Sequence, residues 1–379
     1  FAIENDQART LNDLPEKVSF TGVIIAEPDL KEKIQKLQVK VDGTNSVVLV
    51  TAGRYPAYRY LDLVKITGQL KTPPIISDFN YKNYLQKEGI YSVVDFPKVE
   101  IISQEHQYTA TSFLYEKILV FKEKLGTSIN ANFSSPQNVL IEGMVLGSSK
   151  GLTDELKQKL NTESLSHIIA VSGSHIVILS SMMMVIFLLL GFWRQQGLWL
   201  TILFIWMYIF FVGLPASGVR AGIMGTILLL AQILGRQRTS SRTILLAAAL
   251  MLLQNPWLLF YDVGFQLSFL ACLGIIYGKP LFDLGFNTLG NKLSLLFSWL
   301  NPRAKEVLEG QARSLRDIVS ITLVAQLFTL PVIIYYFNNL SYVAPLANLL
   351  VLPAVEFLMP LGFLSAFLGV FSNFLGWVF

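Results

Sequence analysis

Residues 164–191 constrain this chain most, because they are long enough to cross a lipid bilayer and yet carry several polar side chains. A membrane helix needs about 20 mostly apolar residues, and this run reads SLSHIIAVSGSHIVILSSMMMVIFLLLG. Polar groups at membrane depth are costly, so they usually face a cavity, a transport pathway or one another. The run predicts a membrane helix with a functional first half. The alternative is a helix whose His167 and His175 only bond to neighbouring helices.

The triplet Ser172-Gly173-Ser174 lies within this polar half. Such a triplet inside an apolar run favours a break in the helix, with a second half that begins near Gly173. The new N-terminus would offer free N–H groups and the positive end of a helix dipole, which suit an anion such as phosphate. Transporters place interrupted helices at their substrate sites in this way. A plain kink without a ligand is the alternative.

The composition changes along the chain and separates two kinds of structure. Of the 379 residues, 53% are hydrophobic and the mean hydropathy is +0.50, which is too apolar for a soluble protein of this size. The first 105 residues hold 13 Lys and Arg against 14 Asp and Glu, and the remainder holds 17 against 12. The positive excess therefore lies in the apolar part. Because the chain starts without Met and ends inside an apolar run, we expect a piece of a longer membrane protein.

Residues 1–105 predict a small extracytoplasmic β domain. Asp42-Gly43 is a good hairpin turn, Gly68 indicates a bulge or bend, and residues 78–88 predict a short helix. Five short strands and one helix in so few residues are typical of a small all-β barrel of the oligonucleotide-binding (OB) type. The expected strands, which have β-branched and alternating residues, lie at 16–27, 34–42, 46–52, 61–71 and 90–102.

Barrels of this type bind single strands through aromatic stacking and basic loops. The candidates for DNA contact are Lys31, Lys33, Lys36 and Lys40 around the first hairpin, and Arg54, Tyr55, Tyr58, Arg59 and Tyr60 before the fourth strand. The alternative is a solvated lysine face beside a tyrosine-rich loop that packs on the membrane part. Because the net charge of the domain is near zero, strong affinity driven by phosphate is not expected.

Residues 106–163 predict amphipathic helices that lie at the membrane interface and do not cross it. In residues 112–126 the expected apolar face holds Phe113, Ile118, Phe121 and Leu125, and the charged residues elsewhere are Lys117, Lys122, Glu123 and Lys124.

Residues 164–379 predict a transmembrane channel domain. Residues 341–353, SYVAPLANLLVLP, are too short to cross as a helix at about 1.5 Å per residue, so they predict a re-entrant hairpin. The fold class is then an α-helical polytopic membrane bundle with interrupted and re-entrant helices, plus a small all-β OB-like barrel. The expected spans lie at 165–191, 197–213, 218–235, 242–260, 263–278, 316–337 and 354–379.

The distribution of Lys and Arg predicts how the bundle is oriented, because cytoplasmic loops carry most of the positive charge. If the first span runs inward, the outer loops carry Arg220 alone. The inner loops would carry Arg194, Arg236, Arg238, Arg242, Lys279, Lys292, Arg303, Lys305, Arg313 and Arg316. This asymmetry predicts that the β domain lies on the outer side of the membrane, which points toward import.

Costly polar residues recur within the expected spans, at Arg220, Asp262, Gln266, Gln326 and Asn348. Asp262 and Gln266 are four residues apart and so share a helix face, with Ser268 nearby. Arg220 and Asp262 both lie at outer ends of spans and could pair. For any one of these residues, a role in tying helices together is the ordinary alternative.

The stretch SHIIAVSGSHIVIL, residues 166–179, resembles the signature of the ComEC competence family, which reads roughly H-L-L-A-I-S-G-L-H. Residues 218–256, 262–276 and 325–355 resemble the regions that follow it in the family, and residues 62–94 resemble the family's extracytoplasmic β domain. The resemblance implies an inner-membrane channel through which single-stranded DNA enters the cytoplasm during natural transformation. It also implies a DNA receptor or nuclease outside and a helicase or motor inside.

The resemblance implies a set of residues that line the DNA path or tie the bundle together. Ser174 departs from the family pattern, which has an apolar residue there, and makes this stretch more polar. The path residues carried over are His167, Ser172, Gly173, His175, Arg220, Asp262, Gln266, Ser268, Gln326 and Asn348, and we add Ser174 as their polar neighbour.

Metal-assisted chemistry is not expected of this chain. Three histidines and the single Cys272 contain no His-x-His-x-Asp-His motif and no cysteine metal site, and no GxxxxGK[ST] motif is present. We therefore expect no metal, no cofactor and no catalytic residue. Two alternatives stay open, namely a membrane enzyme that uses His167 and His175 as acid and base, and a transporter of another anionic solute.

Overall fold

The computed structural model describes residues 17–44, 46–74, 81–86, 89–103, 110–148, 151–163, 165–169, 171–235, 240–284, 302–337, 343–372 and 376. The chain divides into two compact units. Unit 1 comprises Phe1–Gln158, Tyr208–Leu214 and Leu361–Phe379, and unit 2 comprises Lys159–Met207 and Pro215–Pro360.

The N-terminal part of unit 1 is a seven-stranded sheet in the order β6-β4-β3-β1-β5-β7, with the short β2 paired to β3. All the pairs are antiparallel except β4 with β6. Lys71, just after β5, bridges Val93 of β6, so the sheet closes on itself as the OB-like prediction requires. The strands are β1 (Val18–Ile24), β2 (Asp29–Leu30), β3 (Ile34–Val41), β4 (Val47–Gly53), β5 (Leu63–Gly68), β6 (Ile90–Asp95) and β7 (Lys98–Ser103).

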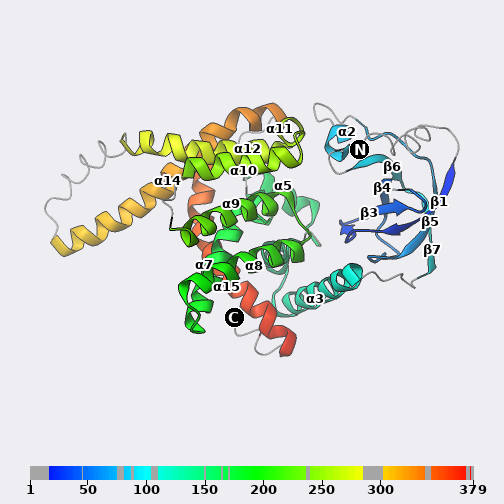
Figure 1. Cartoon of the computed structure of the whole chain (residues 1–379), viewed down its shortest axis with the longest axis horizontal. Coiled ribbons are helices and arrows are strands. Elements are labelled where there is room, and N and C mark those ends of the chain that lie inside the picture. Colours follow the sequence, from blue (N-terminus) through cyan, green and yellow to red (C-terminus); the bar gives the residue numbers. More distant parts are fainter. Residues whose placement is uncertain are drawn as a thin grey trace. The chain divides into compact units, whose positions relative to one another are not determined.

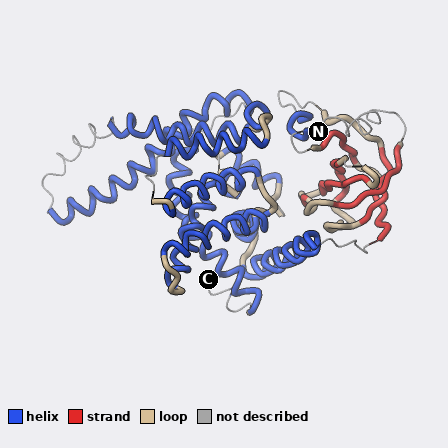
Figure 2. Tube along the Cα trace, viewed as in Figure 1, coloured by secondary structure: helices blue, strands red, loops and turns tan. Residues whose placement is uncertain are grey.

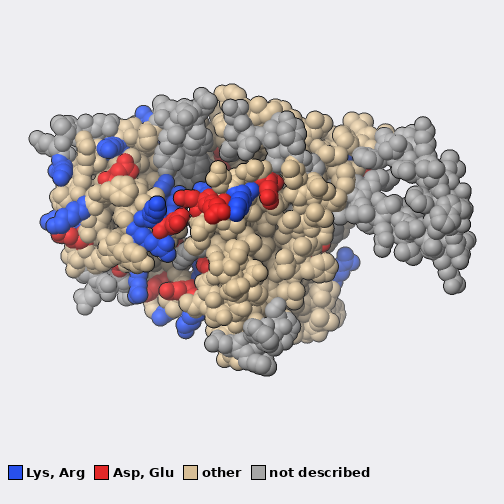
Figure 3. All heavy atoms as spheres, turned by 180° about the vertical axis from the view of Figure 1, so that it is seen from behind, with Lys and Arg blue, Asp and Glu red and all other residues tan. Residues whose placement is uncertain are grey.

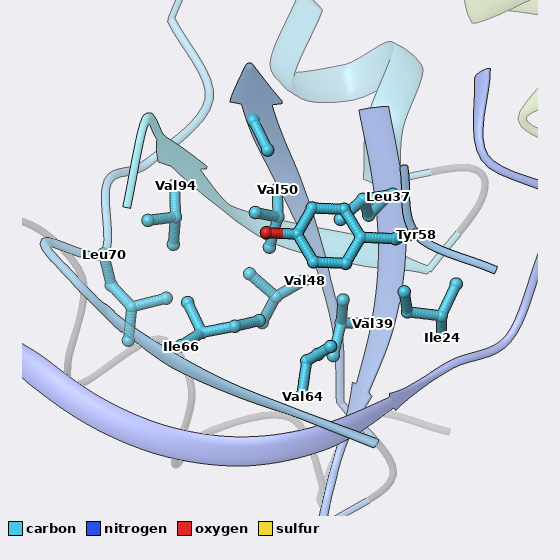
Figure 4. Packing of buried hydrophobic residues seen from close by; sticks show 11 residues of the cluster. Ile24, Leu37, Val39, Val48, Val50, Tyr58, Val64, Ile66, Leu70 and Val94 are labelled. Atoms are coloured by element: carbon cyan, nitrogen blue, oxygen red, sulfur yellow. The ribbon is translucent and has the colours of Figure 1, made fainter. Parts of the chain in front are cut away.

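Aliphatic side chains from alternate strand positions fill the interior of this sheet (Figure 4). In β3, Leu37 and Val39 are fully buried while their neighbours are more exposed, which is the period of two that the sequence predicts. The ring of Tyr58 also lies in this core. The hairpin turn at Asp42-Gly43 is confirmed, because Gly43 has a φ of +77° between the paired β3 and β4.

Two predictions for this domain are wrong. Residues 90–102 form two strands and not one, because the chain turns at Phe96, whose φ is +46°, and at Pro97. Gly68 is not a bulge, since it pairs in register with Val18 and the irregularity in β5 lies between Leu63 and Val64. A Cβ at Gly68 would lie 2.7 Å from Val94 Cγ1, so glycine is needed there for close packing.

The rest of the described chain is helical (Figure 2). The short helix α2 follows the β5 strand, and residues 274–278 form a π-helical turn, η1, that continues α12. The helices are α2 (Tyr81–Gln86), α3 (Ala110–Asn132), α4 (Gln137–Leu146), α5 (Asp154–Thr162), α6 (Ser166–Ile169), α7 (Gly173–Leu189), α8 (Arg194–Val212), α9 (Ala216–Ile233), α10 (Ser240–Gln254), α11 (Leu258–Tyr261), α12 (Val263–Leu273), η1 (Gly274–Gly278), α14 (Pro302–Phe337) and α15 (Ala344–Phe371).

Five helical segments in the described part of the chain are long and apolar enough to cross a membrane. They are Arg194–Val212, Ala216–Ile233, Val263–Leu284, Val319–Tyr336 and Pro353–Phe371. The helices α7 and α10 are apolar but shorter. In Figure 3, Lys, Arg, Asp and Glu gather over part of the visible face and leave wide areas without charge, as lipid-facing helices require.

The predicted re-entrant hairpin at residues 341–353 is wrong. From residue 344 onward, this segment belongs to the continuous helix α15, which has Pro353 and Pro360 in its interior. Proline removes a backbone donor and usually ends a soluble helix, but neighbouring groups can satisfy the freed carbonyls in a membrane helix. The helix α14 likewise begins earlier than the expected span at 316–337 and includes Arg313, which was expected in a loop.

Within the helix at residues 112–126, the structure gives Lys122 a buried partner that the sequence does not show. Lys122 is 5% exposed and its Nζ lies 2.8 Å from Glu27 Oε2, whereas Phe113 and Phe121 are 49% and 41% exposed. Lys122 can be buried because the carboxylate of Glu27 neutralises it and the carbonyl of Val212 accepts a second bond at 3.4 Å. Helical periodicity alone does not show such a partner.

Candidate functional site

The predicted break in the first apolar run is confirmed. The helix α6 ends at Ile169 and α7 begins at Gly173, with Ser172 in an extended conformation at the N-cap (φ −117°, ψ 175°). Serine is a favoured N-cap because its hydroxyl accepts a bond from the first turn of the helix. Gly173 and Ser174 are exposed, so the start of α7 is accessible.

His175 completes this cap from inside the first turn of α7. The backbone N–H of Ser172 donates to His175 Nδ1 at 2.9 Å, and Ser172 Oγ lies 2.9 Å from the same nitrogen. Ser174 Oγ lies 2.8 Å from Ser172 Oγ, so the departure from the family pattern extends this polar cap. Because Nδ1 accepts, the ring is neutral and its proton is on Nε2.

Nε2 of His175 has no hydrogen bond of ordinary geometry within the described part of the chain, although it faces the backbone of Ile168. The side chain is 1% exposed. The exposed His167 is close enough to interact electrostatically with it.

The start of α7 packs against the first two turns of α9. Ser217 Oγ donates to the carbonyl oxygen of Val171 at 2.5 Å. A Cβ at Gly218 would lie 3.6 Å from Val171 Cγ1, and one at Gly173 would lie 3.9 Å from Ala221 Cβ. The broken segment is therefore held against the residues on both sides of Arg220.

Arg220 itself points to the start of α12. It is 6% exposed, and its Nη1 lies 3.8 Å from Asp262 Oδ1, so the suggested pair is present but is too long for a hydrogen bond. Nε of Arg220 is buried without a hydrogen-bond partner among the described residues. A Cβ at Gly264 would lie 3.0 Å from Arg220 Nη2, so this glycine leaves room for the guanidinium.

Asp262 has a second task as the N-cap of α12, since its Oδ1 accepts the N–H of Phe265 at 2.9 Å. Gln266 donates from Nε2 to the carbonyl of Leu259 at 2.8 Å, so it closes the end of α11 and ties the two helices together. The half-buried Ser268 lies further along α12.

We call residues 171–175, 216–221 and 262–265 the three-helix junction, because α7, α9 and α12 all begin there. The helix α9 packs against both α7 and α12 (Figure 1). Sequence reasoning missed Ser217 and Gly264, whose roles depend on neighbours distant in the sequence. Gln326 and Asn348 lie on α14 and α15, where each has a buried side-chain oxygen without a partner in the described structure.

The candidate residues of the β domain do not form one surface. Tyr58 is 7% exposed and donates to the carbonyl of Val99 at 3.4 Å, so it belongs to the core and its assignment to DNA contact is wrong. Tyr60 is half-buried and packs edge-on against Tyr115 at 4.9 Å between ring centroids. Tyr55 is 81% exposed, and Arg54 and Arg59 of the same loop are exposed too.

The side chain of Gln35 fixes the backbone of the loop that carries Tyr55. Sequence reasoning missed this residue. Gln35 is fully buried, and its Nε2 donates to the carbonyls of Gly53 at 2.7 Å and Pro56 at 2.6 Å. Phe96, also missed, is 66% exposed, and its N–H donates to the carbonyl of Thr51 at the same end of the sheet. Two exposed aromatic rings therefore lie at the end where β4 and β6 finish.

The lysines of the first hairpin have different surroundings. Lys31, Lys33 and Lys40 are exposed, whereas Lys36 is partly buried. Burial lowers the pKa of Lys31, and the positive charge of Lys36 lowers it further. These two lysines are close enough to act on one another.

A family model described as "Competence protein" matches residues 144–379. The chain belongs to the competence protein family. The ComE operon protein 3 of Bacillus subtilis (strain 168) is 24% identical over 296 residues, which cover 77% of this chain and 34% of that protein. The chain thus spans about a third of the length of this relative, and no solved structure matches it. Together with the apolar helices, this membership identifies a multi-pass membrane protein of the competence family.

Proposed function

We propose that this chain is the inner-membrane channel of a DNA-uptake system and conducts single-stranded DNA into the cytoplasm during natural transformation. Membership of the competence family supports the role in uptake. The observation that carries the channel itself is the three-helix junction, where a buried arginine and three helix starts meet among helices of lipid-spanning length. Such polar groups are tolerated where a polar substrate passes.

The mechanism would be passive guidance of the strand. Helix N-termini and Arg220 would replace part of the water around successive phosphates, and the histidine and serine groups of the α7 cap would line the path. The chain has no nucleotide-binding motif, so a cytoplasmic helicase or motor would pull the strand. A receptor or nuclease outside would deliver it, and the surrounding lipids would complete the site.

The β domain would receive the strand on the outer side of the membrane. Its exposed rings, Tyr55 and Phe96, are suited to stack on unpaired bases, because every base has an aromatic face. Arg54 and Arg59 lie on the same loop as Tyr55 and would contact phosphates, with the hairpin lysines Lys31, Lys33, Lys36 and Lys40 as further candidates.

A second reading, a membrane enzyme that uses His175, gains no support from the geometry. Ser172 Oγ lies at hydrogen-bond distance from His175 Nδ1, as a nucleophile lies beside its base. The same nitrogen, however, accepts the backbone N–H of Ser172, which is the arrangement of a helix cap. The cap accounts for the contact without any chemistry.

Uptake of labelled DNA by competent cells tests the proposed function. Arg220→Ala and His175→Ala should each reduce the DNA that reaches the cytoplasm by at least about tenfold, since each removes a buried polar group from the path. Arg194→Ala is the matched control, because Arg194 also lies at a helix start but is exposed. Unimpaired uptake in both variants, at equal protein level in the membrane, would remove the junction from the path.

A further inference from the structure

Three helices begin within the three-helix junction, and each contributes positive potential there. The helix α7 starts at Gly173, α9 at Ala216 and α12 at Val263. The first N–H groups of a helix have no partner inside it, and each helix start acts as about half a positive charge. Asp262 Oδ1 satisfies the N–H of Phe265, the third residue of α12. The first two residues of α12 cannot be satisfied by the helix itself.

Arg220 adds a full positive charge to this position, and it is not fully compensated. Its side chain is 8% exposed, its distance to the carboxylate of Asp262 is 3.8 Å, and its Nε has no partner among the described residues. The guanidinium lies against Gly264, the second residue of α12. A buried charge normally has close hydrogen-bonded partners. Within the described part of the chain, the carboxylate of Asp262 offsets the charge of Arg220 without satisfying its donors, and the three helix starts add positive potential.

We infer that the three-helix junction binds one oxyanion of the phosphate class, held by Arg220 and by the first N–H groups of α12, which starts beside the guanidinium. This inference deepens the proposed function, since during transport the anion would be one phosphodiester of the DNA strand. Phosphate accepts several hydrogen bonds at once, so it can satisfy Nε of Arg220 together with backbone N–H groups.

Asp262 would act as the competitor of this anion. Its carboxylate faces the same guanidinium and carries the same sign of charge as phosphate. At 3.8 Å it attracts Arg220 without a hydrogen bond, so an incoming phosphate can take the open donors while Asp262 keeps its bond to Phe265. The repulsion between Asp262 and phosphate keeps the anion weakly held. Weak holding suits a site through which many phosphates pass in turn.

Thermal unfolding of the full chain tests the site, in a detergent that carries no phosphate group. Inorganic phosphate is the probe, and chloride at the same ionic strength is the reference. We expect saturable stabilisation by phosphate, because a ligand of the native state raises the unfolding temperature. Arg220→Gln should raise the dissociation constant at least about tenfold. Asp262→Asn should lower it at least about threefold, because asparagine still caps α12 but no longer repels the anion.

Arg194→Gln is the matched control, since it removes an exposed arginine at the start of α8 and should leave phosphate binding unchanged. If Arg220→Gln does not fold, Asp262→Asn still decides, because tighter binding is not a consequence of lost stability. Stabilisation that is unchanged in the two junction variants, or absent from the unmodified chain, would overturn the site. A short single-stranded oligonucleotide of thymidylates, which should bind with the same dependence on Arg220, then distinguishes a strand phosphate from a lipid headgroup.

The outcomes for site and function are separate. If phosphate binding depends on Arg220 but DNA uptake does not, the anion site stands and the proposed DNA path is wrong. If uptake is lost in Arg220→Ala while phosphate binding is unaffected by Arg220→Gln, the anion site is wrong and the path remains.

Discussion

At the scale of single residues, the junction depends on polar groups that each serve two neighbours. Ser172 caps α7 and orients His175, and Asp262 caps α12 while it faces Arg220. Because Ser172 and Asp262 each bind two partners, neither side chain can move closer to one partner without weakening its contact with the other. Arg220 is therefore held beside a carboxylate that does not close on it, which is the state that favours an added anion.

Tyr55 offers the sharpest test of the β domain. Tyr55→Ala should weaken binding of a labelled oligothymidylate by the full chain by about 5- to 150-fold, because one stacked base is worth about 1–3 kcal/mol. Fluorescence anisotropy at low salt measures this change. Tyr58→Phe is the matched control, because Tyr58 lies in the core and its loss of a hydroxyl should leave binding unchanged. Equal effects of the two substitutions would contradict the assignment of Tyr55.

The two tyrosines also show where sequence reasoning stops. Both lie in one aromatic and basic loop, and composition predicts that such a loop contacts a single strand. The loop turns Tyr58 into the core because Gln35 bonds to the carbonyls of Gly53 and Pro56, which no spacing in the loop shows. By contrast, the Arg220–Asp262 pair could be anticipated, since only a few charged residues lie within the apolar runs and they need partners.

At the scale of helices and strands, local breaks could be predicted where they depend on local groups. The break at Ser172-Gly173 was predicted because the cap is built from adjacent residues. The continuity of α15 through Pro353 and Pro360 was not, because it depends on how packing compensates for the lost backbone bonds. The same holds for the division at Phe96, where the chain adopts a conformation that phenylalanine rarely takes.

The contact between η1 and α14 gives a test of packing at this scale. A Cβ at Gly278 would lie 2.5 Å from Cγ1 of Val324, which is fully buried. Gly278→Ala should therefore lower the free energy of unfolding by about 1–3 kcal/mol. The double variant with Val324→Ala should recover part of this loss, because the clashing methyl group is gone. Denaturant titration in detergent measures the free energy of unfolding of both single variants and of the double variant. If the two single losses simply add in the double variant, Gly278 and Val324 are not in contact.

The ion pair between Glu27 and Lys122 attaches the β domain to α3 within unit 1. Glu27→Gln leaves the Lys122 ammonium buried without its carboxylate, which costs about 3–5 kcal/mol for fully buried pairs. Because the Glu27 side chain is 23% exposed, we expect a loss at or below the lower end of this range. Lys122→Met keeps the packing of the stem, removes the charge and should cost less. If Lys122→Met lowered the unfolding temperature more than Glu27→Gln, the ion pair would not be what stabilises the buried Lys122.

At the scale of the whole molecule, the proposed import of DNA requires a defined orientation in the membrane. The excess of Lys and Arg that follows the first span predicts that the β domain lies outside. The chain allows a direct test, because Cys272 is its only cysteine and Cys272→Ser gives a cysteine-free background. Tyr55 is 81% exposed and Arg194 is exposed at the start of α8, so each accepts a single cysteine as a probe.

In intact spheroplasts, a membrane-impermeant maleimide should modify Tyr55→Cys at once and Arg194→Cys only after the membrane is permeabilised. The reason is that the reagent reaches outer surfaces alone, and Arg194 belongs to the positive set that is retained inside. The Cys272→Ser background should remain unlabelled under both conditions. The opposite pattern would place the β domain in the cytoplasm. A strand could then meet Tyr55 only after it had crossed the bundle, and the β domain would act in release of DNA and not in its capture.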